Sequence, residues 1–422
     1  MAQLTFAPPC VALQTAMPTI TIEWRAEGLS NAQRAWVEAL AHDATALTAP
    51  GTAAETQIAK LRRHAAAARD AGLVAVAKYL VQICDAAAGG DPVPAEQSLK
   101  ATAHGPVMVL VRLQKPDQGA SPFSDVIIGV RDANDVWLET LERRLNDFAR
   151  ALPGYSANWQ KANAPHGASN IGNLVLRAGA SSQSTGPATY PPFDANLRPQ
   201  TGRSWFHWRN MMAANWFGRE ICPTALAALS PAVMRNVSAD AHLRWYANRF
   251  VMYDIGPEIV HGEPIAKLLG ETRDPLVIVK ADALAVLANQ WLGDQKLKAR
   301  SPLAEDLATL LAITFHTLND VIKGSAPPQH RGSSCIMLNW GLQHGGLLPT
   351  EGGWNIDNAK VLAALQSLTR ELLEIETSAD KNRAAKLLAE YGTITPPIQA
   401  VLDRLPPPGA PKPKVIYRIL DQ

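Results

Sequence analysis

The fold is decided by residues 248–282, which read NRFVMYDIGPEIVHGEPIAKLLGETRDPLVIVKAD. Two apolar segments with helical spacing flank a polar loop, and the first ends near Tyr253 while the second begins at about Asp274. The loop contains four residues that interrupt regular structure: Gly256, Pro257, Gly262 and Pro264. The pattern therefore predicts a helix, a long polar loop and a second helix.

The bulk composition narrows the class of protein. A chain of 422 residues is long enough for two lobes with a cleft between them. Its 40 basic and 38 acidic residues nearly cancel, to a net charge of +2, and they form no cluster of five basic residues. We therefore expect no nucleic-acid or membrane partner, and the sequence does not indicate an oligomeric state. The chain shows no signal-peptide pattern and no window of about eighteen apolar residues, so we expect a cytoplasmic protein without a spanning helix.

Cysteine spacing and nucleotide motifs point to no cofactor. The four cysteines are far apart and include no CxxC pair, which predicts buried thiols rather than a zinc ribbon or a disulfide framework. The sequence has no Walker motif, dinucleotide fingerprint or GxSxG motif. We therefore expect neither a cofactor nor a metal.

The order of elements predicts a predominantly helical α+β fold in three parts. Residues 1–200 are expected to form an N-terminal lobe with a helical hairpin and a small sheet, which includes strands at 107–113 and 125–132. Ser30 and Gln33 form a capping-box pattern that begins a helix reaching Leu47. Asp135 is expected to cap a single helix that ends at residues 153–154. Residues 201–405 are expected to form a helical lobe that begins with a helix at 203–218, and 406–422 a linker and a strand, Lys414 to Leu420, that returns to the first sheet.

Several segments, taken in order, resemble the dipeptidyl-peptidase III family of zinc peptidases, in particular its shorter bacterial members. The resemblance covers roughly residues 100–422 and depends on DVIIGVRDANDVWLETLERRLNDFARALPG (125–154), NMMAANWFGREICP (210–223), the Gly256-Pro257 turn, KAD (280–282) and HRGSSCIMLNWGLQHGG (330–346). It implies a two-lobed peptidase-like architecture with a cleft between the lobes. In that family a HExxH-like helix and a glutamate of a second helix hold zinc, and a Glu side chain activates the metal-bound water.

The same alignment implies that the zinc ligands are missing here. Arg249 and Tyr253 stand where the two histidines would be, and Phe250 stands where the general base would be. Val277 and Ile278 replace the paired glutamates. None of these residues except tyrosine is even a poor zinc ligand.

Five residues are candidates for acid–base chemistry in the old metal pocket. Arg249 and Tyr253 are four residues apart and share a helix face, so a guanidinium for an oxyanion and a phenol for a proton could act together. Alternatively, Arg249 pairs with Asp254 or Asp282 and replaces the metal as a strut. The resemblance implies that His330 faces the cleft and that Lys280 and Asp282 surround the metal ligands. A capping role for His330 and a simple salt bridge for Lys280 and Asp282 remain the alternatives.

A second set of residues is expected to bind substrate. It consists of His207, Trp208, Asn215, Asp254 and Arg331. An aromatic core around Trp208 is the alternative to a ligand-lined wall. Glu258 and His261 could rebuild a metal site, although Pro257 and Gly262 favour a loop there rather than the helix that their spacing requires.

Three functions are compatible with these residues. The first is a metal-independent enzyme that carries out acid–base chemistry on a small anionic or aromatic molecule. The second is an inactive pseudo-peptidase that binds a short peptide or another small ligand. The third is a peptidase with a relocated zinc ion.

Overall fold

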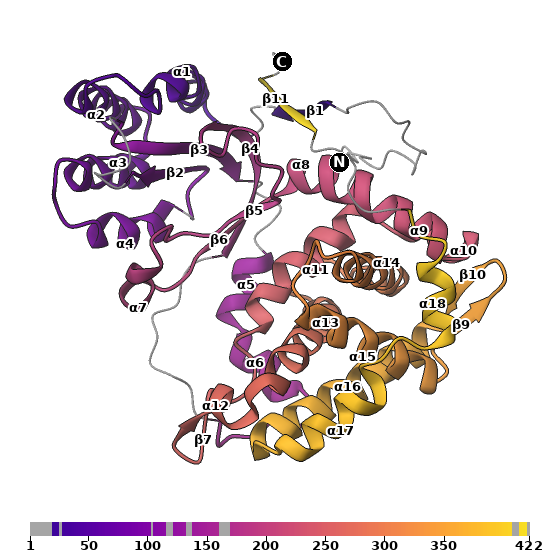
Figure 1. Ribbon diagram of the computed structural model, residues 1–422. Coiled ribbons are helices and arrows are strands. Elements are labelled where there is room, and N and C mark those ends of the chain that lie inside the picture. The colour runs from indigo at the N-terminus through magenta and orange to yellow at the C-terminus, as the bar shows by residue number, and fades with distance from the viewer. Residues whose placement is uncertain are drawn as a thin grey trace. The chain divides into compact units, whose positions relative to one another are not determined.

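The computed structural model describes most of the chain, and the described residues form two compact units (Figure 1). We call them the sheet unit, whose described residues fall within 15–136, 164–215 and 411–422, and the helical unit, whose described residues fall within 137–163 and 216–410. The described residues are 19–24, 28–102, 104–114, 121–131, 137–159, 169–406 and 413–419.

The sheet unit is built on a five-stranded sheet with the strand order β2-β3-β4-β6-β5. The pairs β2–β3, β3–β4 and β5–β6 are antiparallel, whereas β4 and β6 are parallel. Strands β2 and β3 are buried along most of their length, which explains why they read as β-branched runs without a polar face. The strands are β2 (Val107–Leu113), β3 (Phe123–Arg131), β4 (Ser169–Gly179), β5 (Ala188–Thr189) and β6 (Trp205–Trp208).

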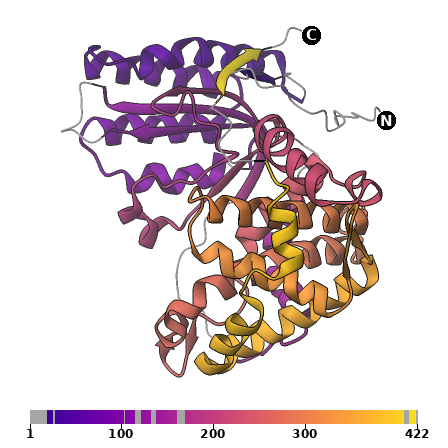
Figure 2. The ribbon, with the colours of Figure 1, turned by 45° about the vertical axis from the view of Figure 1, so that its right-hand side comes forward.

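Three of the four helices of the N-terminal region pack on this sheet, and the fourth, α2, packs on α1 and α3 (Figure 2). Helix α1 contacts β3 and β4, while α3 and α4 contact β2. The predicted capping box is confirmed, because Ser30 Oγ accepts from the backbone of Gln33 and the Gln33 side chain accepts from the backbone of Ser30. The helices are α1 (Asn31–Leu47), α2 (Ala54–Asp70), α3 (Val74–Ala87) and α4 (Val93–Thr102).

The C-terminal strand returns to the N-terminal strand rather than to the five-stranded sheet. Strand β11 (Lys414–Ile419) pairs in parallel with β1 (Thr19–Trp24), and Ile22 lies opposite Tyr417. The two strands form a sheet of their own. The expected return of the chain is therefore observed, but the expected partner was wrong. Leu420, the expected last residue of this strand, lies outside the described residues.

The helical unit surrounds α13 (Arg273–Asp294), which packs against α11, α14, α15 and α16 (Figure 1). Apolar residues occur all around α13 and most of them are buried, as expected for a central helix. Residues Ile265–Asp294 are long and apolar enough to cross a membrane, contrary to our expectation, and 83% of the most apolar window is buried inside the protein. The surrounding helices are α11 (Ala239–Met252), α14 (Leu303–Ile322), α15 (Gln329–Gln343) and α16 (Asn358–Ser378).

The segment 137–151 differs from the single predicted helix of the N-terminal lobe. It forms two helices, α5 (Trp137–Arg143) and α6 (Leu145–Ala151), and belongs to the helical unit. Phe148 of α6 packs against Trp291 of α13, with ring centroids 5.5 Å apart, which explains this placement. The predicted cap of this helix, Asp135, lies outside the described residues.

The predicted helix at 203–218 is also wrong at its start, because residues 205–208 pair as β6 before α8 (Arg209–Met211) and a π-helix, η2 (Met212–Ile221), begin. The π-helix crosses from the sheet unit into the helical unit. The remaining elements are η1 (Ala195–Leu197), α7 (Arg198–Thr201), α9 (Cys222–Ala228), α10 (Pro231–Met234), β7 (Ile259–Val260), β8 (Glu263–Pro264), α12 (Ile265–Leu269), η3 (Gly270–Thr272), β9 (Leu347–Thr350), β10 (Gly353–Ile356), α17 (Lys381–Tyr391) and α18 (Pro396–Leu402).

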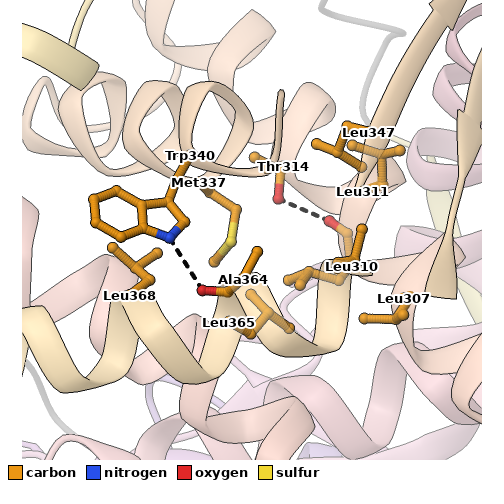
Figure 3. Close-up of a pocket in the computed structure, with 12 residues that line it drawn as sticks. Leu307, Leu310, Leu311, Thr314, Met337, Trp340, Leu347, Ala364, Leu365 and Leu368 are labelled. Carbon is orange, nitrogen blue, oxygen red and sulfur yellow. Dashed lines mark hydrogen bonds between the residues drawn. The ribbon is translucent and has the colours of Figure 1, made fainter. Parts of the chain in front are cut away.

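A small apolar cavity lies between α14, α15 and α16 (Figure 3). Its volume is about 20 Å³, which is roughly the space of one water molecule. The Thr314 hydroxyl at its wall already donates to the carbonyl oxygen of Leu310 at 2.8 Å. The cavity is therefore a packing void of the core rather than a ligand site.

The cysteines follow the expectation in part. Cys84 and Cys335 are buried free thiols, whereas Cys222 is disulfide-bonded. Cys10 lies outside the described residues. The expectation of buried thiols therefore holds for Cys84 and Cys335 but not for Cys222.

Candidate functional site

Helix α11 and its C-cap residue carry a column of three side chains at four-residue spacing: Trp245, Arg249 and Tyr253. The Cζ atom of Arg249 lies 5.4 Å from the ring centroid of Trp245 and 5.6 Å from that of Tyr253. Both distances are within the range of cation–π attraction. The predicted sharing of one helix face by Arg249 and Tyr253 is therefore observed, and Trp245 extends that face by one turn.

The guanidinium of Arg249 also forms an ion pair with Asp282 of α13. Nε of Arg249 lies 2.6 Å from Oδ1 of Asp282, although the N–H is not aligned for a good hydrogen bond. The two side chains are only 12% and 19% exposed. Asp282 is one of the two acids expected as partners of Arg249, and the ion pair connects α11 to α13.

Burial and charge set the protonation of this pair and of Tyr253. Burial is the largest single influence and acts to lower the pKa of Arg249, but Asp282, Tyr253 and Tyr246 together outweigh it, so the net shift of the pKa is upward. Burial raises the pKa of Asp282, and the charge of Arg249 opposes that rise. Burial also raises the pKa of the Tyr253 phenol. Since the ordinary pKa of a phenol is already near 10, Tyr253 keeps its proton at neutral pH.

His330 is the second residue of α15 and lies close enough to Arg249 to feel its charge. Burial and then the charge of Arg249 lower the pKa of His330 to about 4. The imidazole is therefore neutral at pH 7. We call Arg249, Tyr253, Asp282 and His330 the Arg249 cluster, and these are four of the five predicted catalytic residues.

The fifth, Lys280, is occupied elsewhere. Its Nζ atom lies 2.9 and 2.7 Å from the two carboxylate oxygens of Glu376 on α16 and 2.5 Å from the carbonyl oxygen of Ile255. Both charged side chains are 3% exposed. An ammonium group has three N–H donors, so these three acceptors use all of them. Lys280 therefore holds α16 and the end of the α11 segment rather than offering a donor to a ligand.

The predicted substrate-binding residues are divided between the units. His207 and Trp208 are fully buried in β6 of the sheet unit, and the indole of Trp208 donates to Thr189 Oγ1 at 2.9 Å. Burial lowers the pKa of His207 to about 3. Asn215 is 3% exposed and donates to the carbonyl oxygen of Thr185. For Trp208 the structure shows the aromatic-core alternative.

Asp254 and Arg331 belong to the helical unit. Asp254 is half-buried in the turn after α11, and Arg331 is exposed in the first turn of α15. Asp254 is therefore adjacent in sequence to the Arg249 cluster, while Arg331 follows His330 directly.

Glu258 and His261 lie at a β-hairpin, not on a helix. Strands β7 and β8 pair antiparallel, and both loop residues between them, His261 and Gly262, have positive φ angles of 52° and 79°. This is the backbone of a type I′ turn, which favours Gly and Asn. Across the part of the chain that the structure describes, His, Cys, Asp and Glu side chains form no group of three that could hold a metal ion.

Glu376 and Trp245 are the two site-forming residues that sequence reasoning missed. Glu376 occupies a position on the buried stripe of α16, four residues after Leu372 and eight after Leu368. An acid on an apolar helical stripe is a signal that a buried cation lies opposite it. The four-residue spacing of Trp245 from Arg249 was an equally visible signal.

Comparison with known proteins supports the fold. No family model matches the chain. A curated relative, "Nudix hydrolase 3" of Arabidopsis thaliana, is 25% identical over 220 residues, which is 51% of this chain but only 28% of that protein. The chain thus spans little more than a quarter of the length of this relative.

Two solved structures are similar over most of this chain. The structure of dipeptidyl-peptidase III from Caldithrix abyssi has a TM-score of 0.68 at 18% sequence identity. The matched region covers 94% of this chain and 80% of the Caldithrix abyssi chain. The enzyme from Corallococcus sp. strain EGB has a TM-score of 0.60 at 21% identity, with coverages of 91% and 76%. These similarities confirm the predicted fold class, a predominantly helical α+β protein with a dipeptidyl-peptidase III-like architecture.

Proposed function

We propose that this chain binds a short peptide, or another small molecule with an amide group, at the Arg249 cluster and does not hydrolyse it. The observation that carries this proposal is the Arg249–Asp282 ion pair. Of the functions that the sequence allows, it favours the pseudo-peptidase over the metal-independent enzyme.

The donors present do not fit the zinc ion that the fold family implies. Zinc in a catalytic site is held by three protein ligands drawn from His, Cys, Asp and Glu. On the faces of α11 and α13 in question stand Arg249, Phe250, Tyr253 and Asp282, and the carboxylate of Asp282 is already neutralised by a guanidinium. A guanidinium at this place also repels a divalent cation. We therefore derive no step through a metal here.

The ion pair is instead suited to an amide. The two side chains keep 12% and 19% of their surface, and the groups they could offer to a ligand are N–H donors of Arg249 that Tyr253 does not use and the second carboxylate oxygen of Asp282. A peptide group presents a carbonyl acceptor and an N–H donor, which match this donor and acceptor. A bare anion would be bound less well, because Asp282 cancels the charge of Arg249.

The protonation states favour binding over turnover. A general acid or base works best when its pKa lies near the working pH. His330, with a pKa of about 4, stays neutral at pH 7 and is a weak base. Tyr253 keeps its proton because burial raises the pKa of its phenol, and Lys280 has no N–H left to donate.

Calorimetric titration with short peptides tests the proposal. Wild-type protein is expected to bind a tetrapeptide with a micromolar to millimolar Kd. Arg249→Gln is expected to weaken that affinity at least about tenfold, because one charge-assisted hydrogen bond to the peptide is lost. The matched control is Arg244→Gln, because Arg244 lies on the same helix and pairs with Asp306 at 3.0 Å. Equal affinity of Arg249→Gln and wild type would refute the site.

The same incubation separates the other two functions. Mass spectrometry of the peptide after incubation with protein should show it intact. Cleavage products that disappear in His330→Gln and persist in chelator-treated protein would favour the metal-independent enzyme. The observation that favours this second candidate is that His330 lies close enough to Arg249 to feel its charge. Cleavage together with stoichiometric zinc in elemental analysis would favour a relocated metal.

A further inference from the structure

We propose that Glu376 is a positioning residue for the Arg249 cluster. Through Lys280 and the carbonyl group of Ile255, it fixes the turn of residues 253–257 and with it the side chain of Tyr253. The effect on ligand binding rests on the proposed function, whereas the effect on the turn does not. We call Glu376, Lys280 and the Ile255 carbonyl the clamp.

The clamp joins three segments that are far apart in the sequence. Glu376 lies on α16 and Lys280 on α13, and the two are separated by 96 positions. The third member is a backbone carbonyl just beyond the end of α11, 2.5 Å from Nζ of Lys280. Because Glu376 accepts two of the three N–H groups, it orients the ammonium so that the third points at the turn.

The backbone hydrogen bonds of the turn itself lie at the long end of the normal range. They are 3.2 Å from Asp254 N to the carbonyl of Val251 and 3.2 Å from Ile255 N to that of Met252. Ile255 is only 3% exposed, so without Lys280 its carbonyl oxygen would lose its partner where water has little access. Lys280 therefore sets the conformation of the turn.

Gly256 shows how closely the clamp surrounds the turn. It has a φ of +105°, and a Cβ atom at this position would collide with Oε2 of Glu376 and lie 3.1 Å from Nζ of Lys280. Only glycine combines this backbone conformation with this close approach. Any larger residue at position 256 would push the clamp and the turn apart.

Positioning and stability can be separated experimentally. A buried ion pair can often be exchanged for apolar residues of similar size with little loss of stability, because the desolvation cost of both charges disappears. Lys280→Met/Glu376→Leu would therefore keep the packing of α13 against α16. The double variant would not replace the hydrogen bond from Lys280 to the carbonyl oxygen of Ile255. Only the turn would therefore lose a contact and become more mobile.

Hydrogen exchange detected by mass spectrometry tests this proposal. In Lys280→Met/Glu376→Leu, the amides of residues 254–256 are expected to exchange at least about tenfold faster, while Tm stays within a few degrees of wild type. The matched control is Arg244→Met/Asp306→Leu, which removes a buried ion pair of α11 and α14 and should leave these amides unchanged. A tetrapeptide titration should show weaker binding in the first variant only.

Three results would overturn the proposal. The first is unchanged exchange at residues 254–256, and the second is an increase that is uniform across α13 and α16. The third is a peptide affinity equal to that of wild type when the turn is released. If the double variant does not fold, Gly256→Ala is used instead, because its Cβ atom would push the turn away from Glu376 and Lys280. Hydrogen exchange and peptide binding are then measured in the same way. If wild-type protein binds no peptide, the proposed function fails, but the exchange measurement still decides whether Glu376 positions the turn.

Discussion

The guanidinium of Arg249 and the carboxylate of Asp282 lie 2.6 Å apart, and they connect α11 to α13. Trp245 and Tyr253 lie on either side of the same guanidinium. The pair thus has two roles, a connection between two helices and a polar surface for an amide. The two roles make different predictions. Stability should fall when one charged partner is removed and the other is left unpaired, whereas ligand binding should fall whenever the guanidinium and carboxylate groups themselves are replaced.

Removal of one partner of this pair should destabilise the helical unit. We expect Asp282→Ala to lower the free energy of unfolding by about 2 to 4 kcal/mol, slightly less than the usual loss for a fully buried pair, because both side chains keep some solvent contact. Urea denaturation followed by circular dichroism measures this difference.

Asp274→Ala is the control for that prediction. Asp274 lies on the same helix but its side chain is 64% exposed, and its ion pair with Arg273 is worth at most about 1 kcal/mol. The double variant Arg249→Met/Asp282→Leu should recover most of the lost stability and none of the peptide affinity. Equal losses in Asp282→Ala and Asp274→Ala would contradict the connecting role of the pair.

Gly129→Ala should destabilise the sheet unit. A Cβ atom at position 129 would overlap the ring of Trp208, so the indole would have to move and would lose its hydrogen bond to Thr189. Overpacking of this kind costs about 1 to 3 kcal/mol. The measurement is thermal unfolding combined with near-ultraviolet circular dichroism, which should change with the environment of the indole.

Gly186→Ala is the matched control, because a Cβ atom there would have its nearest neighbour 3.5 Å away. It should leave both signals unchanged. A stable Gly129→Ala protein with an unaltered near-ultraviolet spectrum would mean that Trp208 is not packed in the core as described.

The sequence predicted the helices and strands better than it predicted which elements and side chains pair with one another. The spacing of Arg249 and Tyr253 was sufficient to predict their common face, because helix periodicity is local. The pairing of Arg249 with Asp282 depends on how α13 packs against α11, which is a property of the tertiary structure. Likewise residues 205–208, at the start of the predicted helix 203–218, form strand β6, because their pairing with β4 outweighs their local helix propensity. The role of Lys280 depends on Glu376, 96 positions away, and no local pattern contains that relationship.

His261→Asn should stabilise the β7–β8 hairpin. His261 has a φ of 52°, a backbone conformation that Asn adopts more readily than most residues, so we expect a gain of up to about 1 kcal/mol. His261→Val should instead lose about 1 to 2 kcal/mol, because a β-branched residue is strained there. Hydrogen exchange of residues 259–264 measures both changes. A gain of stability in the valine variant would contradict the turn described here.

His242→Phe should make the protein less sensitive to acid. His242 is fully buried, neither ring nitrogen has a hydrogen-bond partner among the described residues, and the ring stacks on Trp216 and Trp245. Burial, followed by the charge of His316, lowers the pKa of His242 to about 3. A phenyl ring would keep the stacking without burying two unsatisfied nitrogens, so stability at pH 7 should be equal or higher.

The sign of the pH effect follows from linkage. The pKa of His242 is about 3 in the folded state and about 6.5 in the unfolded state, so between pH 6.5 and 3 only the unfolded state binds the proton. Stability is therefore complete above pH 6.5 and falls as the pH drops through this window, by about 5 kcal/mol at most from this residue. Urea denaturation at a series of pH values should show a shallower decline for His242→Phe than for wild type. His42→Asn, which changes an imidazole that is 89% exposed, should follow the wild-type curve, and a wild-type slope in His242→Phe would show that His242 does not carry this acid sensitivity.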